Sequence, residues 1–295
     1  FVLIIKIMNI LISNNDFSYL SGSPLSCYEL ARELKNFGHN VIIVSRHIGG
    51  IITQKANEIG IPVYSFDNIP SFKPDILHLN QSVSKEILDR FDIPSIYTIH
   101  SEFECETPLI DERIKKYICI RPSIQEHAIR EHGININKTE VIYNPIDFSR
   151  FNKKGIKDEG YVLFVGTVDP MRRKTIDYLI ANSDKKVLIV GKKFDNYLDN
   201  INSQVEWRDE KWDIEIETKN CSETAGIMLG RSTIEGWACG KNGTIYEIDQ
   251  SYNIKEIKYI KASEVNLDEF DSKKVVKKIE SIYISTIADY SGYNL

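Results

Sequence analysis

Short apolar segments alternate with amphipathic segments along this chain, and the alternation constrains the fold more than any other feature. Segments 8–13, 41–46 and 95–100 are rich in β-branched residues and have the length of buried strands. Segment 27–38 has apolar residues at helical spacing, and Gly38 stands where a helix commonly ends. Strands that alternate with helices predict a parallel sheet with helices on both faces.

The pattern runs through the first half of the chain, breaks, and starts again. The break is the polar segment 151–160, which has no apolar periodicity and is typical of a linker. Further strands are predicted at 61–66, 75–80, 117–120, 140–144, 161–166, 187–191, 205–209 and 243–249, and further helices at 53–60, 82–91, 123–133, 175–183 and 233–240.

We therefore predict an α/β protein with two doubly wound domains, at 1–153 and 154–270, followed by a C-terminal helix and tail at 271–295. Ligands of open α/β sheets bind beyond the carboxyl ends of the strands. We expect the two domains to face each other across a cleft that binds the ligand.

The composition excludes several classes of protein. A net charge of -5 lacks the basic surplus of a dedicated nucleic-acid binder, so no specific nucleic-acid partner is expected. The five cysteines are scattered, and none forms a CxxC pair. We therefore expect free thiols in a reducing cytoplasm rather than a zinc or redox site.

The first residues of the sequence are apolar but do not predict a membrane span. Segment 1–12 is shorter than the roughly 20 apolar residues that a spanning helix needs, and it lacks the features of a signal peptide. We expect the first strand to begin at Met8, with 1–7 as an extension. The expected location is cytoplasmic, with peripheral attachment to a membrane left open.

Two features of the first half are candidates for ligand binding. In the loop 18–26, Gly22 and Ser23 would let the backbone approach a ligand at the start of a helix. His78 and His100 each lie at the carboxyl end of a predicted strand, where a histidine can exchange hydrogen bonds with ligand hydroxyls. The alternatives are an ordinary tight turn for the loop and a structural role for each histidine.

Two segments of the second half are candidates for binding an anion. One is a cluster of cations before a helix, which would neutralise a departing diphosphate. The other is a helix start with free backbone amides, a nearby cation and a carboxylate that can accept hydrogen bonds from ribose hydroxyls. The residues are Arg172, Arg173 and Lys174 in the first segment and Gly230, Arg231, Ser232 and Glu235 in the second. Alone, each segment also fits a solvated turn or a capped helix.

Read in order, these segments resemble the retaining glycosyltransferases of family 4. The stretch 21–45 resembles the family's glycine loop with its following helix and strand, and 75–80 and 93–102 resemble its two strand ends that carry histidine. Segment 133–151 is similar to the interdomain segment. The pieces 161–170 and 234–240 resemble the first strand of the nucleotide domain and its Glu-Ala-Met-Ala-Cys-Gly helix.

The resemblance implies a GT-B fold of two Rossmann-like domains, the first binding mainly the acceptor and the second the sugar nucleotide. It implies transfer of a hexose-type unit from a nucleoside diphosphate sugar to a hydroxyl group of a glycan, a lipid-linked or a small-molecule acceptor. Transfer would proceed with retention of configuration and without a metal or other cofactor. No Asp-x-Asp metal motif ends a predicted strand.

The resemblance also implies roles for single residues. His100 would be the catalytic residue beside the transferred sugar, and His78 would face the acceptor or the sugar. Glu235 would hold the ribose. The diphosphate would meet Gly230 with neighbouring Arg231 and Ser232, the cations Arg172, Arg173 or Lys174, and Gly22 with Ser23 from the other domain.

Two positions depart from the family pattern. The first glutamate of the usual Glu-x7-Glu pair, which normally touches the donor sugar, is Ile227. The arginine that usually follows the strand glycine is Thr167, and the Arg-Arg-Lys run or Arg231 would have to compensate.

Other functions remain open from the sequence. Ile227 favours a non-catalytic subunit that binds a sugar nucleotide and supports a partner. A nucleotide-sugar epimerase shares the two-domain architecture but needs cleft carboxylates that the sequence does not reveal. The donor sugar, its base, the acceptor and the oligomeric state are not determined by the sequence.

Overall fold

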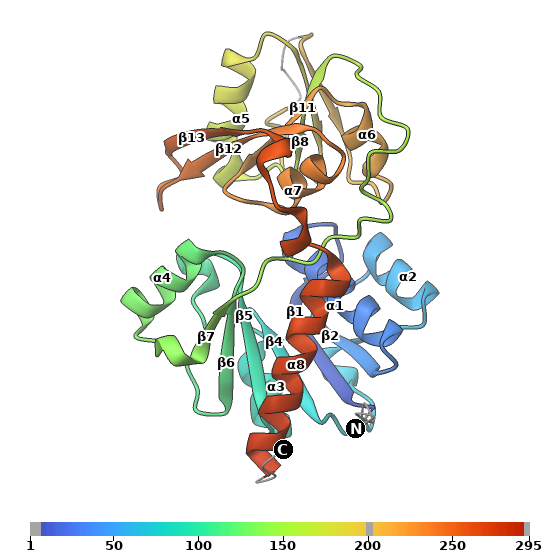
Figure 1. Cartoon of the computed structure of the whole chain (residues 1–295), viewed down its shortest axis with the longest axis vertical. Coiled ribbons are helices and arrows are strands. Elements are labelled where there is room, and N and C mark those ends of the chain that lie inside the picture. The colour runs from blue at the N-terminus through green and yellow to red at the C-terminus, as the bar shows by residue number, and fades with distance from the viewer. Residues whose placement is uncertain (1–6, 199–202, 292–295) are drawn as a thin grey trace. The chain divides into compact units, whose positions relative to one another are not determined.

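Each half of the chain folds around its own sheet in the structure, a computed structural model that describes residues 7–198 and 203–291 (Figure 1). Unit 1 comprises the chain as far as Tyr19, Ser23–Pro145 and the residues from Ser272 onward. Unit 2 comprises Leu20–Gly22 and Ile146–Asp271. The predicted fold class, with two largely parallel α/β sheets, is confirmed.

The described part of unit 1 contains a seven-stranded sheet in the order β3-β2-β1-β4-β5-β6-β7, with every pairing parallel. Two central strands, β4 and β5, are buried along their whole length, which explains their continuous apolar character. The strands are β1 (Asn9–Phe17), β2 (Asn40–Ile48), β3 (Val63–Ser65), β4 (Ile76–Asn80), β5 (Ser95–Ile99), β6 (Ile114–Cys119) and β7 (Thr139–Val141).

The helices of unit 1 include the last one in the chain. They are α1 (Gly22–Asn36), α2 (Gly50–Glu58), α3 (Ser84–Phe91), α4 (Pro122–His132) and α8 (Ser272–Ser291), with short 3₁₀ turns η1 (Phe66–Asn68), η2 (Glu104–Glu106) and η3 (Ile136–Lys138). Helix α4 shows the usual signals at both ends, because Pro122 opens it and Gly133 follows it with φ 63°.

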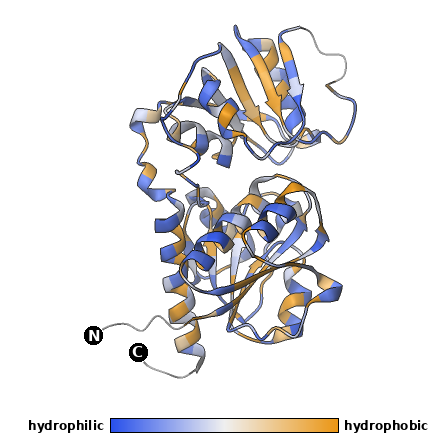
Figure 2. Cartoon of the chain, turned by 90° about the vertical axis from the view of Figure 1, so that its right-hand side faces the viewer, coloured by the Kyte–Doolittle hydropathy of each residue, from blue (hydrophilic) through white to orange (hydrophobic). Residues whose placement is uncertain are grey.

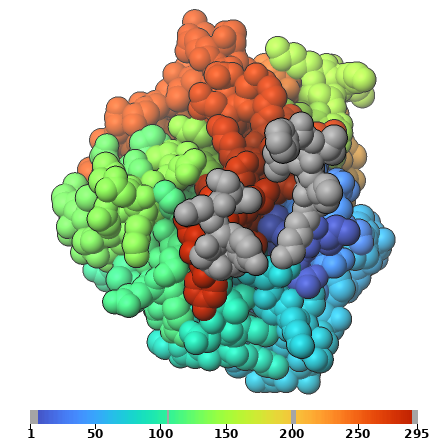
Figure 3. All heavy atoms as spheres, turned by 60° about the horizontal axis from the view of Figure 1, so that its bottom comes forward, coloured from blue at the N-terminus to red at the C-terminus, as the bar shows by residue number. Residues whose placement is uncertain are grey.

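Helix α8 is held to the rest of unit 1 by buried hydrogen bonds. His39 Nδ1 accepts from the Met8 amide at 3.2 Å, so Nε2 carries the proton and donates to Glu280 Oε1 at 2.8 Å. Tyr283 Oη lies 2.6 Å from His78 Nδ1. Figure 3 shows α8, in red, between the green and the blue parts of unit 1.

The described part of unit 2 contains a six-stranded sheet in the order β10-β9-β8-β11-β12-β13, in which only β12 and β13 pair antiparallel. The strands are β8 (Tyr161–Val165), β9 (Lys186–Val190), β10 (Val205–Arg208), β11 (Glu223–Ile227), β12 (Asn242–Ile248) and β13 (Ile254–Ile260). The helices are α5 (Pro170–Asn182), α6 (Glu215–Asn220) and α7 (Arg231–Ala238), with 3₁₀ turns η4 (Ala262–Glu264) and η5 (Leu267–Glu269).

The core of unit 2 lies on its strands, many of which are coloured as hydrophobic in Figure 2. Helix α7 approaches β11 closely, and this approach depends on glycine. A Cβ atom at Gly226 would lie 2.8 Å from Thr233 Oγ1, and one at Gly236 would lie 2.6 Å from Thr224 Cγ2. Gly226 in β11 and Gly236 in α7 therefore set the distance between α7 and the sheet.

The structure differs from the sequence prediction at the predicted linker. The chain leaves unit 1 between Pro145 and Ile146 rather than at 153/154, and it returns at Ser272. The segment 151–160 packs within unit 2, where Phe151 is buried and the Glu159 amide donates to the Asn220 carbonyl at 2.8 Å. The polar composition reflects the exposed side of this segment.

Three elements were missing from the prediction, namely α6, β11 and β13. Most of the predicted N-terminal extension lies outside the described residues, and Ile7 is exposed. Within 7–198 and 203–291, none of the helices is long and apolar enough to cross a membrane.

Candidate active site

In unit 1, two polar side chains meet where β4 and β5 end. His100 follows β5 directly, and its Nε2 atom lies 2.8 Å from Oδ1 of Asn80, the last residue of β4. Parallel pairing brings these strand ends together, since β4 and β5 are neighbours in the sheet. His100 was predicted as a site residue from the sequence, and Asn80 was not.

Asn80 fixes the proton of His100. The Asn80 amide donates from Nδ2 to the Ser13 carbonyl at 2.8 Å, which leaves Oδ1 as the acceptor facing the histidine. His100 must therefore carry its proton on Nε2, and Nδ1 keeps a lone pair. Burial lowers the pKa of His100, and the nearby Glu106 carboxylate partly offsets this decrease. At neutral pH this histidine is an uncharged hydrogen-bond acceptor.

The next residue, Gln81, holds a strained backbone conformation with φ 61°. Its side chain accepts from the Asn15 amide at 3.1 Å and donates to Glu106 Oε1 at 3.1 Å. These contacts join β1 to the loops after β4 and β5, and they explain how a non-glycine residue remains in the left-handed region.

His78 lies inside unit 1 with both ring nitrogens engaged. Nδ1 contacts Tyr283 Oη and Nε2 lies 2.7 Å from Thr98 Oγ1. Burial, and then the nearby His100, lower the pKa of His78 to about 3. The cavity beside it measures about 20 Å³, room for about one water molecule rather than a sugar. This placement favours the structural alternative over contact with the acceptor or the sugar.

Gly22 and Ser23 form the first turn of α1. Gly22 is exposed, and Ser23 Oγ accepts from Asn14 Nδ2 at 2.9 Å, which ties the start of the helix to β1. The backbone amides of this turn stay a predicted contact for a phosphate.

In unit 2, an ion pair occupies the start of α7. Arg231 Nε lies 2.7 Å from Glu235 Oε1, and both side chains are buried, at 6% and 5% exposed. Gly230 precedes the helix as its N-cap. Burial raises the pKa of Glu235, while Arg231 and then Arg150 lower it. The structure thus brings the predicted cation and the predicted ribose ligand together.

Arg150, which was not predicted from the sequence, extends this charged group. Its Nη2 atom lies 2.7 Å from Glu215 Oε2, and its guanidinium stacks 4.8 Å from the centre of the Trp212 ring. Its position before the apparent linker gave no signal, because the contacts come from residues more than 60 positions later in the chain.

The loop between β11 and α7 also holds a strained residue, Met228, with φ 54°. The Gly230 amide donates to the Met228 carbonyl at 2.8 Å, which closes a tight turn. Ser232, in the first turn of α7, is half-buried, and a Cβ atom at Gly226 would lie 3.4 Å from its Oγ. Ile227, which occupies the position of the first glutamate of the Glu-x7-Glu pair, packs against the hydrophobic core of unit 2.

The three predicted cations at the start of α5 point to different partners. Arg172 pairs with the N-cap residue Asp169, and its Nε atom lies 3.3 Å from where a Cβ of Gly166 would be. Arg173 pairs with Asp195. Lys174 donates to Asn253 Oδ1 at 2.7 Å, toward β13.

The three predicted cations therefore do not form one cluster, and it is Arg172 that lies beside Gly166, the glycine that follows β8. Thr167, at the position of the family's arginine, donates to Asp169 Oδ2 at 2.7 Å. Asp169 thus holds both the threonine and Arg172. Among the described residues, no group of three or more His, Cys, Asp or Glu side chains could hold a metal ion.

Comparison with solved structures identifies the class of fold. HepE of Anabaena, in complex with UDP-glucose, superposes with a TM-score of 0.64 at 15% identity, over 97% of this chain and 98% of that one. AviGT4, a glycosyltransferase involved in avilamycin A biosynthesis, gives 0.65 at 12% identity, over 96% and 98%. TarM of S. aureus, a mutant in complex with fondaparinux, α-GlcNAc-glycerol and UDP, gives 0.59 at 9% identity, over 96% and 97%.

The chain therefore has the GT-B glycosyltransferase fold. Residues 20–150 match the model of Glycosyltransferase Family 4, in the part of the chain that contains His78, Asn80 and His100. No curated protein matches the chain in sequence.

Proposed function

We propose that this protein is a glycosyltransferase that moves a sugar from a nucleoside diphosphate to a hydroxyl acceptor, with retention of configuration and without a metal. The observation that carries the proposal is the charged group at the start of α7, on a GT-B fold whose first half matches Glycosyltransferase Family 4. HepE, which binds UDP-glucose, supports a uridine nucleotide as the first donor to test.

Unit 2 is assigned the donor. An incoming diphosphate offers Arg231 a new partner, and the backbone amides at the start of α7 add positive potential. Glu235 is then able to accept hydrogen bonds from ribose hydroxyls. When the donor binds, Arg231 exchanges Glu235 for the diphosphate, and Glu235 exchanges Arg231 for the ribose hydroxyls. Both buried charges therefore keep a partner, whereas a buried carboxylate alone in the empty site would have none.

Arg172 is assigned the diphosphate oxygens. It is held at the end of β8 by Asp169, so it needs little reordering to meet an anion. Arg173 and Lys174 are directed to Asp195 and Asn253 and are assigned no direct contact.

Unit 1 is assigned the acceptor and one side of the transferred sugar. Neutral His100 offers Nδ1 to a sugar hydroxyl, an interaction that a protonated imidazole would lose. The bond from the anomeric carbon to the phosphate oxygen breaks, the acceptor oxygen bonds to that carbon on the same face, and the acceptor proton passes to the leaving diphosphate. The step needs no protein nucleophile.

The test is a panel of UDP-, GDP- and ADP-sugars incubated with the full chain, with and without EDTA, while nucleoside diphosphate release is measured. We expect release from one donor class, unaffected by EDTA, and an NMR spectrum of the product with the anomeric configuration of the donor. Release from none of the donors would overturn the assignment as a transferase.

The second candidate is a non-catalytic subunit that binds a sugar nucleotide. It is favoured by Ile227, a partly buried residue that packs against the core of unit 2 at the position where the family resemblance predicts a carboxylate for the donor sugar. Saturable binding of a donor without hydrolysis or transfer, with or without acceptors, would support this candidate instead.

A further inference from the structure

Strand β13 forms an open edge of the sheet of unit 2. It pairs with β12 on one side, and within the described residues no strand pairs with its other side. Two large apolar side chains on it are exposed, Ile257 at 43% and Tyr259 at 54%. An edge of this kind presents free backbone groups that another strand can bind.

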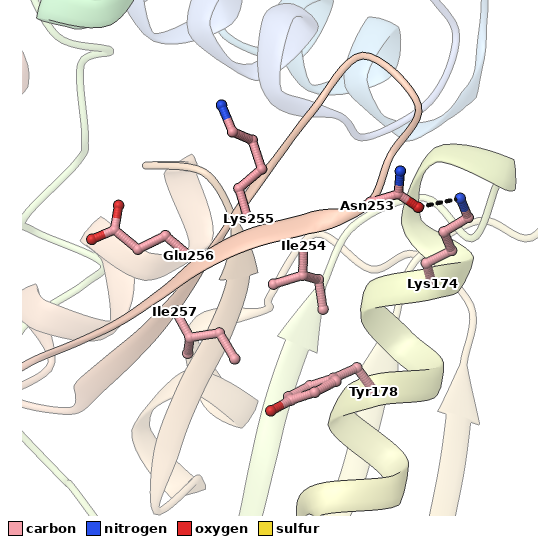
Figure 4. Close-up of a pocket in the computed structure, with 7 residues that line it drawn as sticks. All are labelled: Lys174, Tyr178, Asn253, Ile254, Lys255, Glu256 and Ile257. Atoms are coloured by element: carbon pink, nitrogen blue, oxygen red, sulfur yellow. Dashed lines mark hydrogen bonds between the residues drawn. The ribbon is translucent and has the colours of Figure 1, made fainter.

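A groove of about 640 Å³ runs between this edge strand and α5 (Figure 4). Ile254 and Ile257 point to the side of the sheet on which Tyr178 lies, and Lys255 points to the other side. Tyr178 is 40% exposed and rests on Tyr246 with ring centres 5.9 Å apart. The groove therefore has an apolar wall that continues onto the exposed face of β13.

The charges on β13 select a partner. Glu256 and Lys258 flank Ile257 and point to the opposite face of the strand. A strand paired antiparallel with a copy of itself, with Ile257 opposite Ile257, sets each Glu256 opposite Lys258 of the other copy. Opposite charges directly across an antiparallel pair stabilise it.

Neighbouring registers fail this criterion. A two-fold axis normal to the sheet shifts the pairing in steps of two, so the next registers centre on Glu256 or on Lys258. The first sets Glu256 opposite Glu256, and the second sets Lys258 opposite Lys258. The register between β12 and β13 shifts between Glu247 and Ile248, which leaves Lys255 as an extra residue on β13, so regular pairing is limited to the strand beyond Lys255.

We propose that a second copy of this chain binds here, pairing β13 with β13 antiparallel and centred on Ile257, so that two six-stranded sheets become one. The two-fold axis keeps both α5 helices on the same face. Ile257 of each copy then covers the other and narrows the open side of both grooves next to Tyr178. The surface is separate from the start of α7 and does not depend on the proposed activity.

The test uses two charge variants of the full chain. Glu256→Lys sets a lysine of one copy opposite Lys258 of the other, and Lys258→Glu sets a glutamate opposite Glu256, so each variant repels itself. Mixed together, the two variants restore an attractive pairing. By sedimentation velocity we expect the wild type to dimerise, each variant alone to dissociate at about 10-fold higher concentration, and the equimolar mixture to recover the wild-type constant.

Glu126→Lys is the matched control, because Glu126 is exposed on α4 and the charge change is the same. It should leave the dimer unchanged. Circular dichroism melts of all variants report folding separately, since Lys258 also pairs within the chain with Glu247 at 3.4 Å and with Glu256 at 3.1 Å. A wild type that stays monomeric to about 100 μM, or a dimer that neither variant weakens, would overturn the proposal, as would a mixture that does not recover.

Discussion

The two units end their central strands in different chemistry. In unit 1, the ends of β4 and β5 carry a neutral amide–imidazole pair, in which Asn80 is the last residue of β4 and His100 follows β5. In unit 2, the loop after β11 leads to a buried ion pair, Arg231 and Glu235. β4 and β11 occupy equivalent places, because β4 lies next to β1 and β11 lies next to β8, the strands that come first in sequence in their sheets.

Both of these loops also contain a left-handed non-glycine residue, Gln81 after β4 and Met228 after β11. Such residues cost on the order of 1 kcal/mol each and persist where surrounding contacts hold them. The shared strain with contrasting chemistry is what the proposed division of roles between the two units requires. A charged edge suits a diphosphate, and a neutral edge suits sugar hydroxyls.

The largest effect is expected from breaking the charged edge of unit 2, by which we mean the Arg231–Glu235 ion pair at the start of α7. Arg231→Met leaves Glu235 buried without its partner, so we expect a loss of about 3 kcal/mol in the free energy of unfolding at neutral pH. Urea unfolding measures it. The double variant Arg231→Met with Glu235→Gln should regain most of that loss, and a single variant as stable as the wild type would contradict the assigned ion pair.

Breaking the neutral edge of unit 1, the Asn80–His100 pair, should affect turnover rather than stability. For His100→Ala we expect kcat to fall about 100-fold, with the donor KM within about 3-fold, because the hydrogen bond to the sugar matters most in the transition state. Steady-state kinetics provide both values. The exposed His47, at the end of β2, is the control, and His47→Ala should change neither.

Asn80→Ala should have a smaller effect of the same kind. It removes the acceptor that holds the Nε2 proton of His100, and we expect kcat to fall about 10-fold. A positioning role predicts that adding His100→Ala to Asn80→Ala gives the kcat of His100→Ala alone. Full additivity of the two losses would instead indicate that Asn80 acts independently of His100.

The smallest effect is on the pH dependence of the unfolding free energy, and it tests the structural role of His78. The folded-state pKa of His78 is about 3, below the usual 6.5, so in this range the unfolded chain takes up a proton that the folded chain does not. The stability that this provides is complete above pH 6.5 and is lost as the pH falls toward 3. Between pH 6.5 and 5 we expect unfolding free energy to fall by about 1 kcal/mol per pH unit more in the wild type than in His78→Asn. Equal slopes would contradict the buried neutral state.

The sequence predicted the sheets well and the contacts poorly. Apolar segments such as 41–46 and 95–100 predicted β2 and β5, because buried parallel strands are continuous runs of apolar, often β-branched residues. Strand β11 was missed because the close approach of α7 demands Gly226 and other small residues there. Strand β13 was missed because its exposed edge position mixes charged with apolar residues.

The site shows the same division. His100, Arg231 and Glu235 were visible as residue types at strand ends and helix starts. Asn80 and Arg150 were not, because their roles depend on partners brought together by sheet order and by contacts distant in sequence. His78 had the same local signal as His100, and its burial and its contacts with Thr98 and with Tyr283 of α8 show that it is enclosed.

The most direct test of the account is a calorimetric titration of UDP, GDP and ADP into the full chain, repeated with His100→Ala and Arg172→Ala. The account predicts that one nucleotide binds saturably, that His100→Ala binds it as the wild type does, and that Arg172→Ala binds it about 10-fold more weakly. Binding of none of the three nucleotides, or binding weakened by His100→Ala but not by Arg172→Ala, would contradict the claim that the charged edge of unit 2 holds the donor.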